Sequence, residues 1–258
     1  MSAAGPRVRR LTHRLLDVVF PPRCVVCRKA GAWYCARCLT QLPREPLTLC
    51  ARCVQPLAPG TLRCPVCRAP SPSSLVSVTT WGVYGAALKQ GVFALKYHRR
   101  QAIAPLLADL LTPFLSVLCR PGDIIVPVPL HPRRERERGY NQTAILARAL
   151  ADGLALAGCP GVRVRSDLLR RTKVTADQTL LGPDDRRRNM ANAFAAAPMP
   201  SWPSGTRLWL CDDVVTTGAT LHACAVALRD QGGSAPVHGL ALARAAIGLL
   251  PHYKVSGA

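Results

Sequence analysis

The sequence predicts an α/β protein, in which a parallel sheet is flanked by helices and preceded by a small zinc-binding module. Three observations predict this fold. Strand-like and helix-like apolar segments alternate from residue 75 onward. Eight of the 12 cysteines precede that point, in four C-x-x-C pairs. Near the C-terminus an apolar run leads into two adjacent aspartates, Asp212 and Asp213. We therefore expect a zinc module over residues 1–70 and a sheet domain over residues 71–258.

The paired cysteines indicate structural zinc. Two thiolates separated by two residues can face one tetrahedral ion, and two such pairs complete a four-cysteine site. Residues 1–70 have few periodic apolar runs, so metal would replace a core there. Four pairs predict two zinc ions, and sequential pairing is favoured over interleaved pairing because it keeps each loop short. A redox or disulfide role is the alternative. The predicted ligands are Cys24, Cys27, Cys35, Cys38, Cys50, Cys53, Cys64 and Cys67.

The remaining elements follow a turn-rich linker at residues 69–74. Short apolar runs predict strands, and apolar residues spaced as on one helix face predict helices. The four unpaired cysteines stand in apolar surroundings and are expected to be buried thiols; they are Cys119, Cys159, Cys211 and Cys224. The predicted strands span 75–84 (a strand or hairpin), 123–128, 162–165, 208–212 and 237–242, and the predicted helices span 86–97, 105–118 with a kink at Pro113, 140–157 and 221–230, the last one ending at Gly232-Gly233.

The segment after the strand at 208–212 has the chemistry of a phosphate and sugar site. Its turn and the start of the next helix contain Thr216, Thr217, Gly218, Ala219 and Thr220. Backbone N–H groups at a helix N-terminus attract an anion, and the threonine hydroxyls add donors. The two aspartates would repel phosphate but suit ribose hydroxyls or a cation. The expected ligand therefore carries both a phosphate and a diol, and the alternative is an ordinary strand–turn–helix with two solvated acids.

A second segment, residues 126–142, also leaves a predicted strand. Two prolines precede an expected loop with four arginines, which Gly139 allows to turn tightly. Arginine holds diphosphate by paired hydrogen bonds, and Mg²⁺ would bridge the diphosphate oxygens. The alternative is a solvated loop in which the arginines pair with Glu135 and Glu137. The arginines are Arg133, Arg134, Arg136 and Arg138. His131 and His222 are expected to be structural.

The net charge is +20 and the pI is near 10.3. Such an excess favours anionic partners, among them nucleic acid, phosphorylated sugars and anionic lipid, and arginines spread over solvated faces are the alternative. The most apolar window, residues 102–119, contains Asp109 and two prolines, so a buried helix is expected rather than a transmembrane segment. No signal peptide is evident, and we expect a cytoplasmic protein.

The acid pair and the T-T-G-x-T turn resemble the phosphoribosyl diphosphate (PRPP) signature of type I phosphoribosyltransferases. The whole chain resembles the ComF family (competence protein F), which joins a double zinc ribbon to a phosphoribosyltransferase-like domain. Two positions depart from that family's pattern, where Arg99 and Asn192 replace usual glycines. The resemblance rests on Phe20-Pro21-Pro22-Arg23-Cys24, Leu95-Lys96-Tyr97, the blocks at 127–142 and 170–194, and the turn.

The resemblance implies roles for these residues. Asp212 and Asp213 would hold the ribose and act in catalysis, Thr216 to Thr220 would bind the 5′-phosphate, and the arginine segment with Gly139 would bind diphosphate. A flexible loop would close over the substrate with Arg171, Thr175, Gln178, Arg186 and Asn189. The implied function is binding of PRPP with Mg²⁺ and of single-stranded DNA, alongside DNA-uptake proteins in natural transformation. The alternative is an active phosphoribosyltransferase of nucleotide metabolism with an unknown acceptor.

Overall fold

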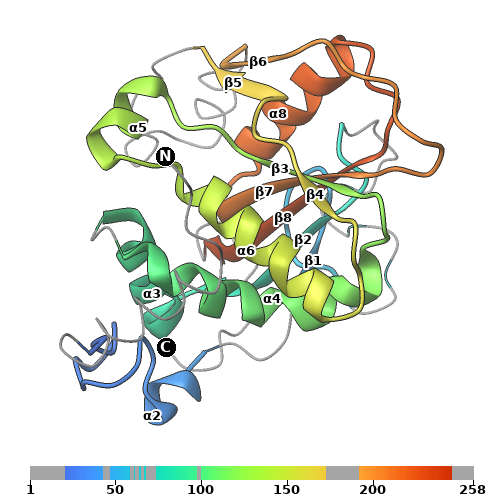
Figure 1. Cartoon of the computed structure of the whole chain (residues 1–258). Helices are drawn as coiled ribbons and strands as arrows, with labels where there is room; N and C mark the ends of the chain where they lie inside the picture. Colours follow the sequence, from blue (N-terminus) through green and yellow to red (C-terminus); the bar gives the residue numbers. More distant parts are fainter. Residues whose placement is uncertain are drawn as a thin grey trace.

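The chain folds around one mixed, mostly parallel sheet (Figure 1). The computed structural model describes residues 21–42, 47–58, 61, 64, 67, 74–97, 100–172 and 192–245. Within them the sheet has six strands in the order β1-β2-β8-β7-β3-β4, and only β1 runs antiparallel to its neighbour. The strands are β1 (Leu47–Leu49), β2 (Val78–Tyr84), β8 (Val237–Ala245), β7 (Leu208–Val215), β3 (Ile124–Pro127) and β4 (Arg163–Val164).

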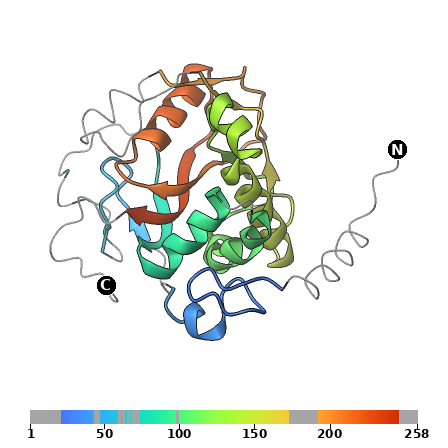
Figure 2. The ribbon, with the colours of Figure 1, turned by 90° about the vertical axis from the view of Figure 1, so that its left-hand side faces the viewer.

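Helices cover both faces of this sheet, which confirms the predicted α/β class (Figures 1 and 2). Side chains alternate along a strand, so each strand contributes to two cores. In β7, Trp209 and Cys211 join the core of the first face, whereas Leu208 and Leu210 join the core beneath α8. The first face carries α3 (Ala86–Tyr97), η1 (Gln101–Ile103), α4 (Ala104–Leu118) and α6 (Gln142–Leu156), and the second carries α8 (Ala219–Asp230).

The helix pair α4 and α6 forms the densest part of the first core. Leu107, Leu111 and Leu115 of α4 are fully buried, as are Leu146 and Leu150 of α6. Each such side chain contributes about 1.5–3 kcal/mol by leaving water. The segment Gln101–Leu118 is long and apolar enough by composition to cross a membrane, but core helices pass the same test. Its buried leucines and its packing on α6 agree with the predicted core helix.

Most predicted elements are present, with shifted ends. The strands predicted at 208–212 and 237–242 continue to Val215 and Ala245. Pro113 lies inside α4, which remains one helix. Gly232 adopts φ +80° after α8, and the Gly233 N–H donates to the Leu228 carbonyl, as a glycine helix end requires. The sequence pattern did not reveal the short α2 (Ala36–Leu39), or β1, or the separate hairpin of β5 (Leu169–Arg171) and β6 (Phe194–Ala196).

The zinc-binding segment contacts the sheet domain directly. Strand β1, inside the predicted zinc module, pairs with β2. Tyr34 is 4% exposed, and its hydroxyl donates to the Ala87 carbonyl at 2.7 Å. A methyl group on Gly91 of α3 would lie only 2.2 Å from the Tyr34 oxygen, so this glycine permits the close packing. The boundary at residue 70 stays a prediction, but main-chain and side-chain contacts cross it, and linker residues 69–73 lie outside the described residues.

Candidate functional site

Two groups of four cysteines have the geometry of zinc centres. Within each group all four sulfur atoms lie within 4.8 Å of one another. The Cys27–Cys35 and Cys53–Cys64 sulfur pairs are 3.6 Å apart. A tetrahedral ion with Zn–S bonds of about 2.3 Å needs sulfur atoms about 3.8 Å apart, so both groups fit zinc. The groups are Cys24, Cys27, Cys35 and Cys38, and Cys50, Cys53, Cys64 and Cys67, which confirms the sequential pairing.

The first C-x-x-C pair of each centre sits on the same kind of turn. The Cys24 N–H donates to the Lys29 carbonyl, and the Cys50 N–H donates to the Gln55 carbonyl, both at 2.8 Å. The residue after each pair, Arg28 or Val54, then has a positive φ of 66° or 51°. Repetition of this turn at both centres supports the double zinc ribbon. The four unpaired cysteines are buried thiols, as predicted.

The ends of β3 and β7 bring the two predicted ligand segments together. These strands are parallel neighbours, and the Val128 N–H donates to the Cys211 carbonyl just before the acid pair. Ligands of open parallel sheets bind beyond the carboxyl ends of the strands. The arginine segment and the threonine turn therefore leave the same edge of the sheet.

Asp213 is held from two helices. Its carboxylate forms a salt bridge with Lys96 of α3 at 2.6 Å and accepts a hydrogen bond from the Gln142 amide of α6 at 2.7 Å. The residue is 3% exposed. Burial lowers the pKa of Lys96, but the charge and hydrogen bond of Asp213, together with Asp212 and Tyr84, outweigh burial and raise that pKa above its usual value. Asp213 is thus a fixed negative charge whose position depends on α3 and α6.

Asp212 has a different environment. Alternation along β7 sends its side chain to the opposite face from Asp213, so the two carboxylates do not point the same way. It is half-buried, and its carboxylate accepts the N–H of Asp213 at 2.8 Å. Burial raises the pKa of Asp212 to about 7, and the negative charge of Asp213 adds to the rise, while Lys96 and Arg171 oppose it. Asp212 therefore changes charge near neutral pH.

The turn after β7 opens α8 as predicted. Gly218 has φ +76° and precedes the first helical residue, Ala219. The Ala219 N–H donates to the Thr217 hydroxyl at 3.4 Å. The helix begins two residues before the predicted start at 221, so Thr220 belongs to its first turn. Backbone donors of that turn lie at the same edge of the sheet, just beyond Val215, where β7 ends.

The second zinc centre packs on this turn. A methyl group on Gly218 would lie 2.7 Å from Val54 Cγ1, so the Val54 side chain packs closely against the Gly218 backbone. Val54 is fully buried, and its carbonyl accepts from Arg244 Nε at 2.8 Å. His222 of α8 lies 3.1 Å from both the Arg52 carbonyl and the Ser74 hydroxyl, which agrees with its expected structural role. The second centre therefore contacts the candidate phosphate turn directly.

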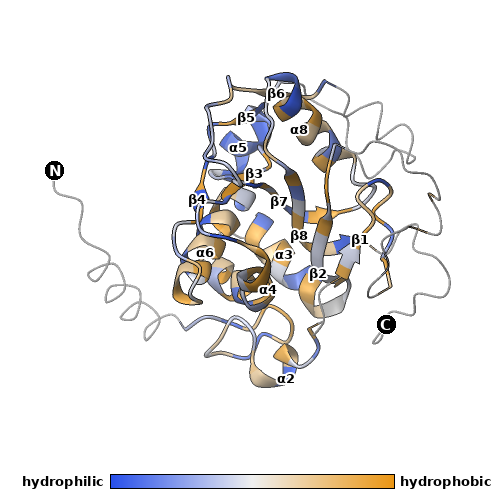
Figure 3. Ribbon diagram, turned by 90° about the vertical axis from the view of Figure 1, so that its right-hand side faces the viewer, coloured by the Kyte–Doolittle hydropathy of each residue, from blue (hydrophilic) through white to orange (hydrophobic). Residues whose placement is uncertain are grey.

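The prediction of a loop for the arginine segment is wrong over Pro132–Arg138, which forms helix α5. Its arginines and glutamates are helix formers without an apolar stripe, so hydrophobic periodicity gave no signal (Figure 3). His131 accepts the Arg133 N–H at 3.2 Å and caps the helix, as its predicted structural role requires. Gly139 ends the helix with φ +84°, where the tight turn was predicted.

The α5 arginines have distinct surroundings. Arg133 pairs with Glu137 one turn later at 2.9 Å, which matches part of the solvated alternative. Arg138 donates to the Gln142 side chain, whose amide also binds Asp213. One hydrogen-bonded chain thus joins the candidate diphosphate helix to the acid pair. Arg134 lies near Arg171 of β5, and burial together with Arg134 lowers the pKa of Arg171.

The remaining predicted loop residues cannot be placed. Thr175, Gln178, Arg186 and Asn189 lie outside the described residues, as does Arg99. Arg171 is half-buried, and the negative charge of Asp212 acts to raise its pKa against the effect of burial. Asn192 has φ +55°, the left-handed backbone that a glycine would adopt there. Sequence reasoning assigned no role to Lys96 or Gln142, because neither contact with Asp213 has a local sequence signal.

Comparison with known proteins identifies the family. The family model of the double zinc ribbon domain matches residues 15–68. Competence protein F from Haemophilus influenzae is 31% identical over 221 residues, which cover 81% of this chain and 92% of that protein. The chain belongs to the ComF family. DNA utilization protein YhgH from Salmonella typhimurium is 35% identical, over 83% of this chain and 93% of the relative. Competence protein ComFC from Bacillus subtilis is 26% identical, over 94% and 99%.

A solved structure of a Helicobacter pylori xanthine-guanine-hypoxanthine phosphoribosyltransferase also matches, over 56% of this ComF-family chain and 83% of that protein. Its sequence identity is 14% and its TM-score is 0.30, which is too low to support inference about the site. The fold assignment rests instead on the strand order, the helices on both faces and the double zinc ribbon.

Proposed function

We propose that this ComF-family protein binds PRPP with Mg²⁺ and handles single-stranded DNA during DNA uptake. The observation that carries the PRPP half is the meeting of three elements at one edge of the sheet: the acid pair of β7, the threonine turn of α8 and the arginine helix α5. The turn would bind the 5′-phosphate, the acids the ribose hydroxyls, and Arg134, Arg138 and Gly139 the diphosphate. The names of the relatives, which refer to competence and DNA utilization, support the DNA half.

The same arrangement suits a reaction at the anomeric carbon. The bond from C1′ to diphosphate oxygen would break, and the electron pair would leave with the diphosphate. Negative charge on Asp213, fixed by Lys96 and Gln142, would stabilise the cationic ring, and the α5 arginines would stabilise the leaving group. Mg²⁺ would supply charge neutralisation of the diphosphate. Transfer to an acceptor is the second candidate function, and diphosphate release from PRPP measures it.

Calorimetry tests the binding proposal directly. Purified zinc-loaded protein is titrated with PRPP in the presence of Mg²⁺, and then with a single-stranded oligonucleotide. Saturable binding of both ligands is expected. Binding of PRPP alone would favour the transferase of nucleotide metabolism. Heat changes no larger than those of dilution in both titrations would contradict the proposed function. Cytoplasmic location stays a prediction.

PRPP affinity should rise with pH between about 6 and 8. Burial and Asp213 raise the pKa of Asp212 to about 7, so ligand-free protein is partly protonated there. A carboxylate that accepts sugar hydroxyls must be ionised, and binding should therefore release a proton. Calorimetry in buffers of different ionisation enthalpy measures that release. Asp212→Asn is the control, because it removes the contribution of this carboxyl group and leaves the titration of the ligand phosphate. An unchanged proton release in this variant would contradict the role of Asp212.

Single-stranded DNA affinity should fall steeply with salt. Each phosphate neutralised by the protein releases a counterion, so the logarithm of affinity changes with the logarithm of salt by about −0.7 per contact. Single strands should be preferred to duplex, because unpaired bases expose faces that can stack on aromatic side chains. Fluorescence anisotropy of a labelled oligonucleotide over a salt series measures both effects. Micromolar or weaker binding that barely responds to salt would reject the DNA-handling proposal.

A further inference from the structure

Two aromatic rings stand exposed side by side at the C-terminal end of α3. Phe93 is 42% exposed and Tyr97 is 59% exposed, and their ring centroids are 4.7 Å apart. Among the large apolar side chains exposed on the described residues, these two are the aromatic ones. Exposure of apolar rings to water is unfavourable, and a cluster of exposed rings marks an interaction surface. By contrast Tyr34 is buried in the core.

Arginines accompany the rings. The Arg138 guanidinium lies 5.2 Å from the Tyr97 ring centroid, at the end of α5. The Arg100 guanidinium lies 5.8 Å from the Trp33 ring centroid, between the first zinc centre and α4. Trp33 is partly exposed. Rings that alternate with guanidinium groups offer stacking faces for bases and cations for phosphates within a few ångströms.

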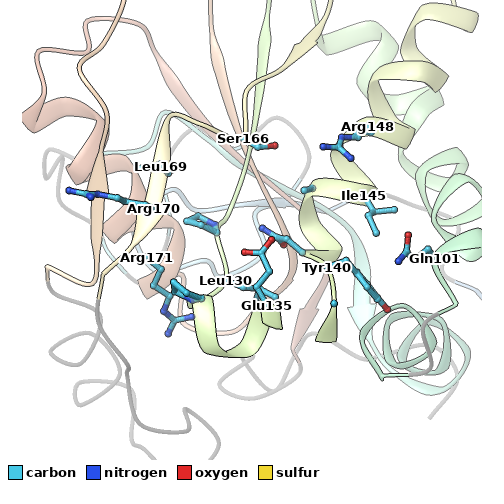
Figure 4. A pocket seen from close by; sticks show the side chains of 15 residues that line it. Gln101, Leu130, Glu135, Tyr140, Ile145, Arg148, Ser166, Leu169, Arg170 and Arg171 are labelled. Carbon is cyan, nitrogen blue, oxygen red and sulfur yellow. The ribbon is translucent and has the colours of Figure 1, made fainter. Parts of the chain in front are cut away.

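One cavity is lined by residues that are sequence neighbours of both pairing arginines (Figure 4). Its volume is about 500 Å³, and it runs between α5, α6 and β5. Gln101, next to Arg100, and Gly139, next to Arg138, both line it. Arg148 of α6 lies on its wall (Figure 4), with Arg170 and Arg171 of β5 on the far side. One acid, Glu135, lines it with these three arginines, so the cavity is suited to an anion.

We propose that this surface is the path of single-stranded DNA. The aromatic–arginine strip consists of Trp33, Phe93, Tyr97, Arg100, Arg138 and Arg148. Two or three bases stack on its rings, and the sugar-phosphate backbone follows the arginines into the cavity. Duplex DNA is excluded, because paired bases keep their faces stacked on one another. The inference rests on the proposed DNA function and assigns it a location that shares Arg138 with the PRPP site and extends along α3 to Trp33 of the first zinc centre.

Removal of the rings tests the stacking half. Phe93→Ala with Tyr97→Ala should weaken binding of a fluorescent oligothymidylate by at least about tenfold, since base stacking on aromatic rings accounts for that much or more. The matched control is Val117→Ala with Leu156→Ala. These two side chains are 83% and 87% exposed and lie at the C-terminal ends of α4 and α6. Tyr97→Phe keeps the ring and should bind as the wild type does. Equal affinity of the ring variant and its control overturns the proposal.

Removal of the charges tests the backbone half. Arg100→Gln with Arg148→Gln should lower the salt slope by about 1.4, the value for two phosphate contacts on a single strand. Arg120→Gln with Arg229→Gln has the same net charge but changes exposed arginines at the opposite edge of the sheet, and its slope should stay unchanged. PRPP affinity should not change in either variant, because none of these arginines belongs to the PRPP site. Equal slopes in the two variants overturn the location.

The wild-type protein supplies an independent measurement. An oligonucleotide with 5-bromodeoxyuridine should photo-crosslink to peptides that contain Trp33, Phe93 or Tyr97, and crosslinks confined to other peptides overturn the proposal. Absence of any single-strand binding by the wild type overturns the DNA half of the proposed function together with this inference. Binding that the ring and charge variants retain overturns the strip alone and leaves the proposed function in place.

Discussion

Replacement of both acids, Asp212→Asn with Asp213→Asn, is expected to lower the affinity for PRPP by about 100-fold or more. A hydrogen bond to a charged group contributes about 1.5–3 kcal/mol, so two carboxylates that hold ribose hydroxyls account for at least two powers of ten. Asparagine is preferred to alanine because Asp213 is bonded to both Lys96 and Gln142. Truncation of Asp213 to alanine would leave the largely buried Lys96 side chain without its partner. This would cost about 3–5 kcal/mol of stability.

The controls separate binding from folding. Asp109→Asn with Asp152→Asn makes the same change in net charge at two exposed positions on α4 and α6, and should leave PRPP affinity unchanged. Lys96→Met with Asp213→Asn removes both members of the salt bridge, so any loss that it shares with the acid variant does not arise from an unpaired lysine. Calorimetry with PRPP and Mg²⁺, after thermal melts have shown that each variant is folded, gives the comparison. Wild-type affinity in a folded double-acid variant would mean that these carboxylates do not contact the ligand.

Loss of one zinc centre is expected to have a large and unequal effect. Freshly purified, reduced protein should contain about two zinc ions. Cys53→Ser with Cys67→Ser should remove one ion and also lower PRPP affinity by at least about tenfold, since Val54 of that centre packs against Gly218 of the phosphate turn. Cys27→Ser with Cys35→Ser removes the other ion, and its main effect should be on the melting temperature, because that centre packs on α3 through Tyr34.

Elemental analysis and calorimetry check this pair of variants. A finer test keeps both ions: Gly218→Ala places a methyl group 2.7 Å from Val54 Cγ1 at a residue with φ +76°, and should also weaken PRPP binding. Adding Val54→Ala removes the clash but not the backbone strain, so recovery should be partial. Protein without zinc, or equal PRPP affinity in the two cysteine variants, would contradict the proposed coupling. Deletion of residues 1–70 is a poorer test, because it removes β1 and exposes the core beneath Val54.

Local sequence determined most of the architecture. Cysteine spacing predicted both zinc centres and their pairing, because two ligands on one short turn must face the same ion. The apolar runs predicted β3, β7 and β8, and the helix-spaced apolar faces predicted α3, α4 and α6. The order of acids, threonines and glycine predicted the turn that opens α8, since each residue type in it has a local backbone or hydrogen-bonding reason.

Only the tertiary structure decided how these parts meet. Lys96 and Asp213 are 117 residues apart in the chain, and Val54 and Gly218 are separated by 164, so no local pattern records either contact. Helix α5 escaped prediction because a helix without a buried face has no hydrophobic period. The surroundings of the two aspartates also differ by packing alone. Asp213 reaches Lys96 and Gln142, whereas Asp212, one residue earlier on the same strand, faces the other side and has its pKa raised to about 7 by burial.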